Sequence, residues 1–184
     1  VGHPIPINIE NSVAAMAMAQ ISGCSAEELK YGIKSFRGVD RRFDFAIKDD
    51  SHVLISDYAH HPNEIYQSAK SIKEIYINRK ITAIFQPPLY PRPRAFYKAF
   101  AEALSPLDEV ILCDIYPARE IPIPGVTSDL IFENLSSGVQ KSMIKTSEVL
   151  DLVKSRDFDV LVILGAGDLD NYVPEITKKK KEKD

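Results

Sequence analysis

The chain has 184 residues, of which 45% are apolar and 27% are charged, and its formal net charge is −3. This balance is typical of a globular protein with one core, or with one domain and part of another, and the weak negative charge argues against a nucleic-acid-binding protein. Cys24 and Cys113 form neither a disulfide framework nor a metal pattern, and no apolar run approaches the roughly 20 residues that span a bilayer. We therefore expect a cytoplasmic protein that acts without nucleic acid or membrane.

The first part of the chain predicts a pair of helices. Residues 11–22 have apolar side chains at helical spacing and are followed by Gly23, which suits a helix C-terminus. Ser25 and Glu28 stand in the register of a capping box that opens a second helix. The expected buried stripe of this helix consists of Leu29, Ile33 and Phe36. Because no strand separates the two helices, we place a domain boundary near Gly38.

From residue 39 onward, strands and helices alternate. The predicted strands are 42–48, 52–56, 81–85, 109–115, 143–145 and 159–164. The predicted helices are 63–77, 95–104, 129–136, 148–156 and a last helix near the C-terminus. A turn at Asp49-Asp50 would join the first two strands as a hairpin. The other strands are nearly continuous in Val, Ile and Leu, which predicts an α/β fold with a doubly wound, mostly parallel sheet. We expect the basic tail, residues 178–184, to be disordered.

One predicted strand-to-helix turn concentrates polar chemistry. It reads Asp57-Tyr58-Ala59-His60-His61-Pro62. A turn at the carboxyl end of a strand in an open α/β sheet faces the ligand crevice, and the following helix start offers free N–H groups and a partial positive charge. Pro62 fits the first helical position, where its missing N–H needs no partner. The alternative is a polar connection with surface histidines.

Three further loops follow predicted strands and would lie at the same edge of the sheet, namely residues 86–94, 116–125 and 165–168. The first holds Arg92 and Arg94 on a proline-rich backbone, which suits either a bound carboxylate or phosphate or a solvated surface loop. Residues 165–168 lack the third glycine of a dinucleotide-binding motif. We expect them instead to let the backbone approach the occupant of the crevice.

Two kinds of site are missing from the sequence. No glycine is followed by lysine, so there is no phosphate-binding P-loop. No cluster of His, Cys and carboxylate residues has the spacing of a metal site. The chain therefore lacks its own machinery for gripping a triphosphate and Mg²⁺, although Arg41-Arg42 fits either a phosphate contact or an exposed basic pair.

Several motifs, in the right order, resemble those of the Mur ligases. Asn8-x-x-Asn11 with Ala14-Ala15 is similar to the end of the family's central ATPase domain. Gly38-x-x-Arg41-Arg42-Phe43 is similar to the junction with its C-terminal domain, and residues 57–62 match the family's signature. The resemblance assigns residues 1–38 to the helical end of the central ATP-binding domain. It assigns residues 39–184 to the Rossmann-like C-terminal domain.

The later motifs point to the members of the family that add L-alanine. Phe85-Gln86-Pro87 to Arg94 resembles the substrate loop, and Gly165-Ala166-Gly167-Asp168 agrees with the family's closing motif. Asp114-x-Tyr116-Pro117-Ala118-x-Glu120-x-Pro122, with Gly125 and Ser128, resembles the alanine-adding members most closely. The resemblance implies an ATP- and Mg²⁺-dependent ligase of peptidoglycan precursor synthesis. Its substrates would be UDP-N-acetylmuramate and L-alanine, and an acyl phosphate would be the intermediate.

The resemblance also implies the role of individual residues. Contacts with adenine, ribose and phosphates would come from Asn8, Asn11, Asp57 and Arg42. The reacting centre would be lined by Tyr58, His60 and His61. The carboxylate of L-alanine would be bound by Arg92, with Arg94 as second choice and Tyr90 beside them. No residue is assigned to a metal.

Two stretches depart from the family's usual sequence. Ile7 stands where the family usually has histidine, and residues 88–93 read Pro-Leu-Tyr-Pro-Arg-Pro in place of His-[Arg or Leu]-Tyr-Thr-Arg-Thr. Because the P-loop and the UDP-binding domain would lie outside this chain, in its own N-terminal and central domains, we expect the isolated chain to be inactive. Two alternatives stay open. One is a ligase that attaches a preformed peptide to UDP-muramic acid, and the other is a non-catalytic module that binds a nucleotide or anion.

Overall fold

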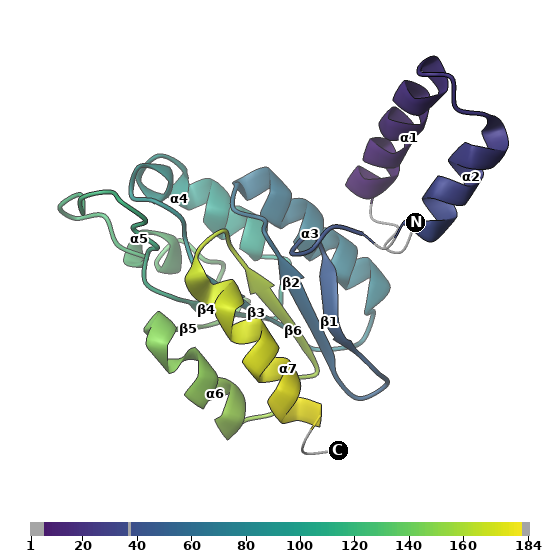
Figure 1. Ribbon diagram of the computed structural model, residues 1–184. Helices are drawn as coiled ribbons and strands as arrows, with labels where there is room; N and C mark the ends of the chain where they lie inside the picture. The colour runs from purple at the N-terminus through teal and green to yellow at the C-terminus, as the bar shows by residue number, and fades with distance from the viewer. Residues whose placement is uncertain (1–5, 37, 182–184) are drawn as a thin grey trace. The chain divides into compact units, whose positions relative to one another are not determined.

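The computed structural model describes residues 6–36 and 38–181, and the chain divides into two compact units, residues 1–40 and 41–184 (Figure 1). The first unit contains helices α1 (Pro6–Ile21) and α2 (Ala26–Ser35), which contact each other. Helix α1 begins earlier than the predicted residue 11, because Pro6 serves as a helix start. Ile7 lies in α1, but its side chain is outside the described residues.

The capping box at the start of α2 is confirmed. The Ser25 N–H donates to Glu28 Oε2 at 2.8 Å, and the Glu28 N–H donates to Ser25 Oγ at 3.4 Å. The expected buried stripe is wrong, since no residue of α2 is buried and Phe36 is 47% exposed. Two short helices have too little surface between them to enclose a core.

The second unit is built on one six-stranded sheet. Its strands are β1 (Asp44–Lys48), β2 (Val53–Asp57), β3 (Ile81–Phe85), β4 (Glu109–Leu112), β5 (Gln140–Met143) and β6 (Val160–Leu164). Their spatial order is β1-β2-β6-β3-β4-β5, and only β1 runs antiparallel to its neighbour. The predicted hairpin and the predicted doubly wound, mostly parallel sheet are both confirmed.

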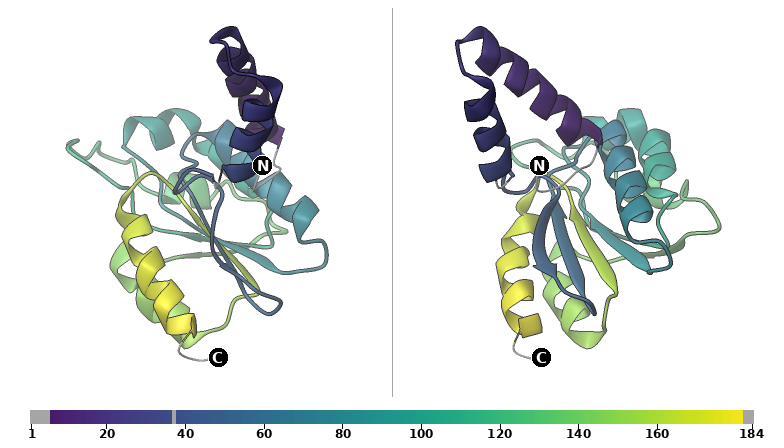
Figure 2. Two further views of the ribbon diagram at one scale, coloured as in Figure 1. Left: turned by 45° about the vertical axis from the view of Figure 1, so that its right-hand side comes forward. Right: turned by 90° about the vertical axis from the view of Figure 1, so that its right-hand side faces the viewer.

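Helices cover both faces of this sheet. One layer contains α3 (Pro62–Ile75), α4 (Pro91–Leu104) and the short α5 (Asp129–Phe132), which contact one another in sequence order. The opposite layer contains α6 (Val149–Ser155) and α7 (Val173–Lys181), each preceded by a 3₁₀ turn, η1 (Thr146–Glu148) and η2 (Asp168–Tyr172). The right-hand view of Figure 2 shows the two layers on either side of the sheet.

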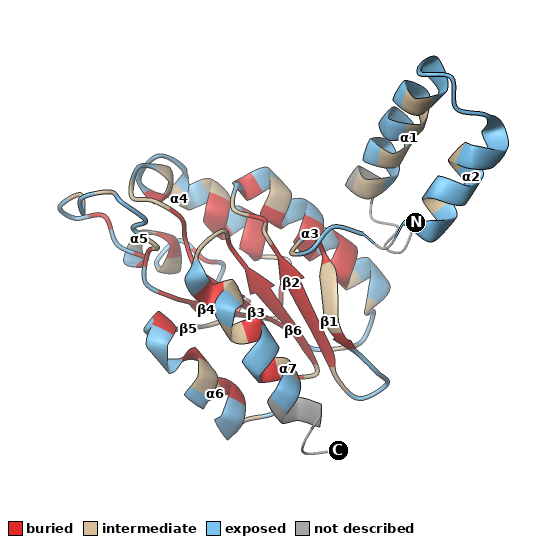
Figure 3. Cartoon of the chain, viewed as in Figure 1, coloured by how far each residue is buried: buried red, intermediate tan, exposed pale blue. Residues whose placement is uncertain are grey.

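The core lies between the sheet and these helices. Strands β2, β3, β4 and β6 are buried along their whole length, as the red colouring in Figure 3 shows. On the α6–α7 side the sheet contributes Leu54, Ile84, Ile111, Leu161 and Ile163 to one apolar cluster. On the other side Phe85 packs on Phe100 of α4, with ring centroids 5.5 Å apart. Burial on both faces explains why these strands are continuous in apolar residues.

Several predicted boundaries need correction. Helix α4 begins at Pro91 rather than at residue 95, because proline is accepted in a first helical turn, and its backbone bends at Phe96. Strand β5 is Gln140–Met143 rather than 143–145, and β4 ends at Leu112, before the predicted residue 115. Helix α5 ends at Phe132, before the predicted residue 136. Helix α7 continues through Lys178–Lys181, since lysine favours helix, and residues 182–184 lie outside the described part.

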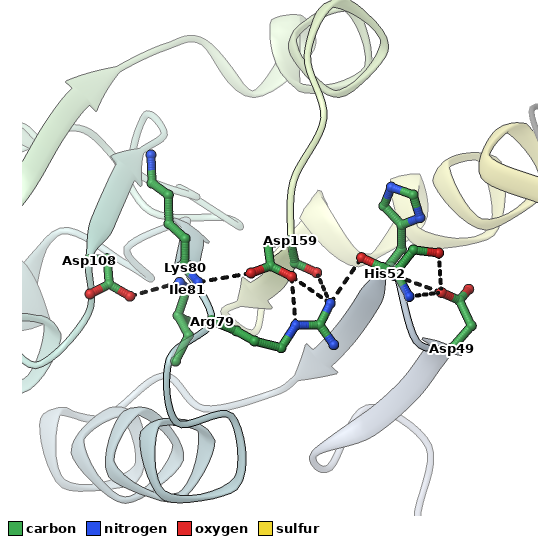
Figure 4. Close-up of polar contacts among 8 residues, drawn as sticks. Asp49, His52, Arg79, Lys80, Ile81, Asp108 and Asp159 are labelled. Atoms are coloured by element: carbon green, nitrogen blue, oxygen red, sulfur yellow. Dashed lines mark hydrogen bonds and ion pairs between the residues drawn. The ribbon is translucent and has the colours of Figure 1, made fainter.

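The amino-terminal edge of the sheet is held by ionic contacts (Figure 4). Arg79 donates from Nε to Asp159 Oδ1 at 2.6 Å and from Nη2 to the Ser51 carbonyl at 2.9 Å. The N–H of Lys80 donates to Asp159 Oδ2 at 3.0 Å, and the N–H of Ile81 donates to Asp108 Oδ2 at 2.8 Å. These contacts tie the starts of β3 and β6 to the β1–β2 turn.

Glu109 extends this ionic edge into the core. Its carboxylate accepts two hydrogen bonds from Arg156, at 2.9 and 2.6 Å, and others from Lys80 and Thr82, each at 3.0 Å. Burial raises the pKa of Glu109, but these donors outweigh it and lower the pKa to about 2. The carboxylate therefore stays charged and paired at neutral pH.

Candidate active site at the carboxyl edge of the sheet

The four predicted loops do lie at one edge of the sheet. The last residues of β2, β6, β3 and β4 are neighbours, since Asp57 is paired with Leu164, Leu164 with Phe85, and Phe85 with Leu112. Each of these strands is followed directly by one of the loops. The opposite edge carries the ionic network, so the two ends of the sheet have different chemistry.

Asp57 is the buried residue of the turn after β2, with 7% exposure. One carboxylate oxygen accepts the hydroxyl of Ser68 from α3, and the other accepts the N–H of Ala59 at 3.2 Å. Burial raises the pKa of Asp57 above its ordinary value, against the opposing effect of these hydrogen bonds. Asp57 thus fixes the turn against α3.

Two arginines and a histidine contact the ring of Tyr58. The guanidinium carbons of Arg41 and Arg42 lie 4.8 and 5.5 Å from the ring centroid, and the His60 ring stands edge-on at 5.1 Å. The Tyr58 N–H donates to the Arg41 carbonyl at 2.6 Å, which brings the segment before β1 to the turn after β2. The predicted pair Arg41-Arg42 therefore lies beside the predicted signature.

The two arginines differ in how far they are engaged. Arg41 has a positive φ of 61°, lies 3.0 Å from a carboxylate oxygen of Asp170 through Nε, and donates to the Gly167 carbonyl at 3.4 Å. Arg42 Nη1 lies 3.8 Å from Glu64 Oε1, and the Arg42 side chain is 53% exposed. Since exposed ion pairs are weak, the Arg42 guanidinium is the one available to an anion.

His60 is held in one orientation. Its Nδ1 is 2.9 Å from the Tyr58 carbonyl, which can only accept, so Nδ1 carries the proton. In the neutral imidazole Nε2 is then the acceptor, and it has no hydrogen-bond partner among the residues that the structure describes. This nitrogen can therefore take a proton from a ligand or bond to one.

His61 and Pro62 form the start of α3. His61 is the N-cap, and its Nδ1 accepts the Asn63 N–H at 3.4 Å, while Pro62 occupies the predicted first position. The His61 ring packs on Phe96 of α4, with centroids 5.6 Å apart. This contact brings the turn after β2 together with the first half of α4.

Arg92 and Arg94 stand in the first turn of α4, not in a free loop. Arg92 is half-buried, Arg94 is exposed, and neither forms an ion pair within the described ranges. The N–H of Tyr90, the residue before the helix, donates to Glu120 Oε2 at 3.1 Å. Glu120 comes from the 116–125 loop, so the two loops are joined at the helix start.

The segment after β3 also pairs with the segment after β4. Leu89 has a positive φ of 42°, its N–H donates to the Tyr116 carbonyl at 2.9 Å, and the Tyr116 N–H donates to the Pro87 carbonyl at 2.9 Å. Pro88 and Tyr116 form an isolated parallel bridge. These contacts extend the β3–β4 pairing beyond the ends of the strands.

Gln86 fills the space between the loops, with 2% exposure. Its amide group donates to Asp168 at 2.8 Å and to Thr146 at 3.2 Å, and it accepts the Leu169 N–H at 3.3 Å. A Cβ on Gly167 would lie 2.2 Å from Gln86 Oε1. The absence of a Cβ at Gly165 and Gly167 therefore leaves room for Gln86.

The remaining predicted site residues belong to the first compact unit. Asn8 and Asn11 lie on α1, in the first unit. No group of three or more His, Cys, Asp or Glu residues in the described part of the chain could hold a metal ion. Within the same part, no helix is long and apolar enough to cross a bilayer.

Two residues that organise the site, Gln86 and Glu64, were not predicted from the sequence. Gln86 was treated only as the start of a loop, although a polar residue at the end of a buried strand indicates a side chain with hydrogen-bond partners in the site. Glu64 was not singled out, although it stands three residues after His61 in capping-box register. Histidine is an uncommon N-cap residue, so the capping box of His61 and Glu64 was not predicted from the sequence.

Comparison with known proteins agrees with this geometry. Residues 41–167 match the family model described as Mur ligase, glutamate ligase domain. The chain is 63% identical over 175 residues to the UDP-N-acetylmuramate–L-alanine ligase of Phocaeicola vulgatus, and 51% identical over 175 residues to that of Parabacteroides distasonis. These matches cover 95% of the chain and 38% of each relative, so the chain spans well under half of their length.

Solved structures of Mur ligases also match this chain. The UDP-N-acetylmuramate–alanine ligase of Thermotoga maritima matches with a TM-score of 0.78 and 28% identity, over 98% of this chain and 39% of that one. A murein peptide ligase from Psychrobacter arcticus matches with a TM-score of 0.63 and 20% identity, over 92% and 36% of the two chains. At that identity the second match shows the fold alone.

Proposed function

Because the chain belongs to the Mur ligase family, we propose that it is the C-terminal portion of an ATP-dependent UDP-N-acetylmuramate–L-alanine ligase. The enzyme would form the amide between the muramyl carboxylate and L-alanine by way of an acyl phosphate. The observation that carries the proposal is the 63% identity to a relative of that name over 175 residues, which include the whole cluster around Tyr58.

We assign residues 1–38 to the end of the central ATP-binding domain and residues 39–184 to the C-terminal domain. Two observations support this division. The family model starts at residue 41, where the second compact unit also starts. In the first unit, Val13, Met18 and Ile21 are 57%, 65% and 81% exposed, which fits an apolar face that the rest of a central domain would cover.

The reacting centre would be lined by Tyr58, His60 and His61. Positioning and charge neutralisation carry most of the barrier reduction in a reaction that passes through an acyl phosphate. The exposed guanidinium of Arg42 suits the phosphates, and His60 Nε2 suits a proton of the attacking amine. Both groups belong to the same cluster around the Tyr58 ring.

The nucleotide would be contacted by Asp57 and the two asparagines. The Asp57 carboxylate accepts hydrogen bonds from Ser68, Ala59 and Phe43, and an ionised carboxylate has about four acceptor positions, so a ribose hydroxyl remains compatible. Asn8 and Asn11 would bond the adenine edge. ATP supplies the phosphoryl group when bound, and Mg²⁺ would be held mainly by parts of the enzyme outside this chain.

Arg92 would bind the carboxylate of L-alanine, with Arg94 as second choice and Tyr90 nearby. The guanidinium group of Arg92 suits a carboxylate, and it stands in the first turn of α4, where the helix dipole favours a negative charge. The proposed reaction uses ATP and a UDP-sugar, which supports a cytoplasmic location.

The test compares the full-length enzyme with the 184-residue chain. The full-length enzyme, mixed with ATP, Mg²⁺, UDP-N-acetylmuramate and L-alanine, is expected to release phosphate and form UDP-N-acetylmuramoyl-L-alanine. The 184-residue chain under the same conditions is expected to release none above background. A full-length enzyme that accepts a preformed tripeptide but not L-alanine would refute the assignment.

A further inference from the structure

Glu64 touches both histidines of the proposed reacting centre. Its Oε2 accepts the N–H of His60 at 3.0 Å and the N–H of His61 at 3.1 Å. The same oxygen lies 3.5 Å from His60 Nδ1, and Oε1 lies 3.8 Å from Arg42 Nη1. One carboxylate therefore contacts three of the residues that the proposed function uses.

These contacts exceed what helix capping requires. A capping box needs the carboxylate only at the N–H of the N-cap, which is His61. Glu64 also takes the N–H of His60, one residue outside the helix, and so fixes two successive peptide units. Neither the Ala59–His60 peptide nor the His60–His61 peptide can rotate without breaking one of these hydrogen bonds. The direction of the His60 ring is therefore set by Glu64 together with the Tyr58 carbonyl.

The charge of Glu64 suits this task. Burial raises its pKa, whereas hydrogen bonds from the N–H groups of His60 and His61 and the charge of Arg42 lower it, and the net pKa lies below its ordinary value. The side chain is ionised at neutral pH and is 38% exposed. It also lies in the first turn of α3, where the helix dipole favours a negative charge.

We propose that Glu64 is a positioning residue of the ligase reaction, which holds His60 and His61 in their working arrangement without touching substrate. This inference rests on the proposed function. It predicts that hydrogen-bond acceptance by the side chain matters more than its charge. It also predicts that the chemical step depends on Glu64 more than substrate binding does.

Kinetics of the full-length enzyme test the role. Glu64→Ala is expected to lower kcat about tenfold or more, because small misplacements of catalytic groups have effects of that size, with KM for L-alanine changed less than about twofold. Glu64→Gln keeps an acceptor oxygen and is expected to restore kcat to within about threefold of the unaltered enzyme. Glu74→Ala is the matched control, since Glu74 lies on the same helix and forms only an exposed pair with Lys70.

Hydrogen exchange on the 184-residue chain tests the geometry without activity. Glu64→Ala is expected to speed exchange of the His60 and His61 amide protons about tenfold, and Glu64→Gln and Glu74→Ala are expected to leave them slow. Unchanged exchange in Glu64→Ala would overturn the proposal even if that variant of the full-length enzyme failed to fold.

The outcomes separate the two proposals. If the unaltered full-length enzyme forms no product, the proposed function fails, and the positioning role fails with it. If the enzyme is active and Glu64→Ala keeps kcat within about twofold, the positioning role alone is overturned. Equal losses of kcat in Glu64→Ala and Glu64→Gln would show that charge, not acceptance of the two N–H groups, is what matters, and would also overturn it.

Discussion

Replacing Gly167 by alanine tests the packing at the carboxyl edge of the sheet. Gly167 has φ −90° and ψ −154°, which an alanine can adopt, so the backbone adds no strain. The added Cβ would lie 2.2 Å from Gln86 Oε1, 2.9 Å from Gln86 Cδ and 2.9 Å from Tyr116 Cγ. The Gln86 side chain must therefore move.

The magnitude follows from the contacts of Gln86. Its amide group takes part in three hydrogen bonds in a site that is 2% exposed. At about 1 kcal/mol for each bond, their loss destabilises by about 3 kcal/mol. The lower entropy of the unfolded alanine chain offsets about 0.4–1 kcal/mol of this. We expect a decrease of about 2–3 kcal/mol in the free energy of unfolding.

Urea denaturation followed by circular dichroism measures this decrease. Gly138→Ala is the matched control, because its Cβ would meet only Ser136 Oγ, at 3.9 Å. In a Gln86→Ala background the hydrogen bonds of Gln86 are already lost, so Gly167→Ala is expected to cost less than in the unaltered chain, with only the contact with Tyr116 remaining. A Gly167→Ala variant within about 0.5 kcal/mol of the unaltered chain would refute the reasoning.

Three further substitutions or probes test other parts of the fold. Glu109→Gln should destabilise by about 3 kcal/mol by breaking a buried ion pair. Because the pKa of Glu109 is lowered from 4.5 to about 2, its stabilisation is present above pH 4.5 and is lost as the pH falls toward 2. The unfolding free energy of the variant, measured by urea titration, should therefore depend less on pH in that range, and parallel curves would contradict this. Glu120→Ala should speed amide exchange at Tyr90 several-fold, at a cost of about 1 kcal/mol, because it removes the acceptor of the Tyr90 N–H; unchanged exchange would mean that this hydrogen bond is not formed in solution. Burial raises the pKa of Cys113 to about 12, so a thiol reagent at pH 8 should label Cys24 alone in the folded chain and both cysteines in urea; rapid labelling of Cys113 without urea would contradict its burial.

The strands that lie inside the sheet could be predicted from the sequence. Residues 81–85 were predicted to the residue because a run of apolar and β-branched residues is bounded by polar residues on both sides. The predicted position of strand β5 was wrong because Gln140–Met143 is an exposed edge strand without alternating apolar residues. Its position is set by backbone pairing with β4, which sequence periodicity does not report.

The site was predictable in its location but not in its internal contacts. The order of strands and helices was enough to place the four loops at one edge. The start of α4 was missed because prolines at residues 91 and 93 were read as loop residues, whereas a first helical turn needs no N–H at those positions. Contacts over long sequence separations, such as Arg41 with Asp170 and Gln86 with Asp168, carry no local signal.

The separation of the two sheet edges has a consequence for protein engineering. Strands β2 and β3 are each five residues long. Their length places the ionic contacts of Figure 4 about 16 Å from the turns that bear Arg42 and His60. Perturbations that far apart, without shared partners, add independently. The proposed acceptor specificity can therefore be altered by substitutions in the turns, while lost stability is recovered by strengthening ion pairs at the amino-terminal edge of the sheet.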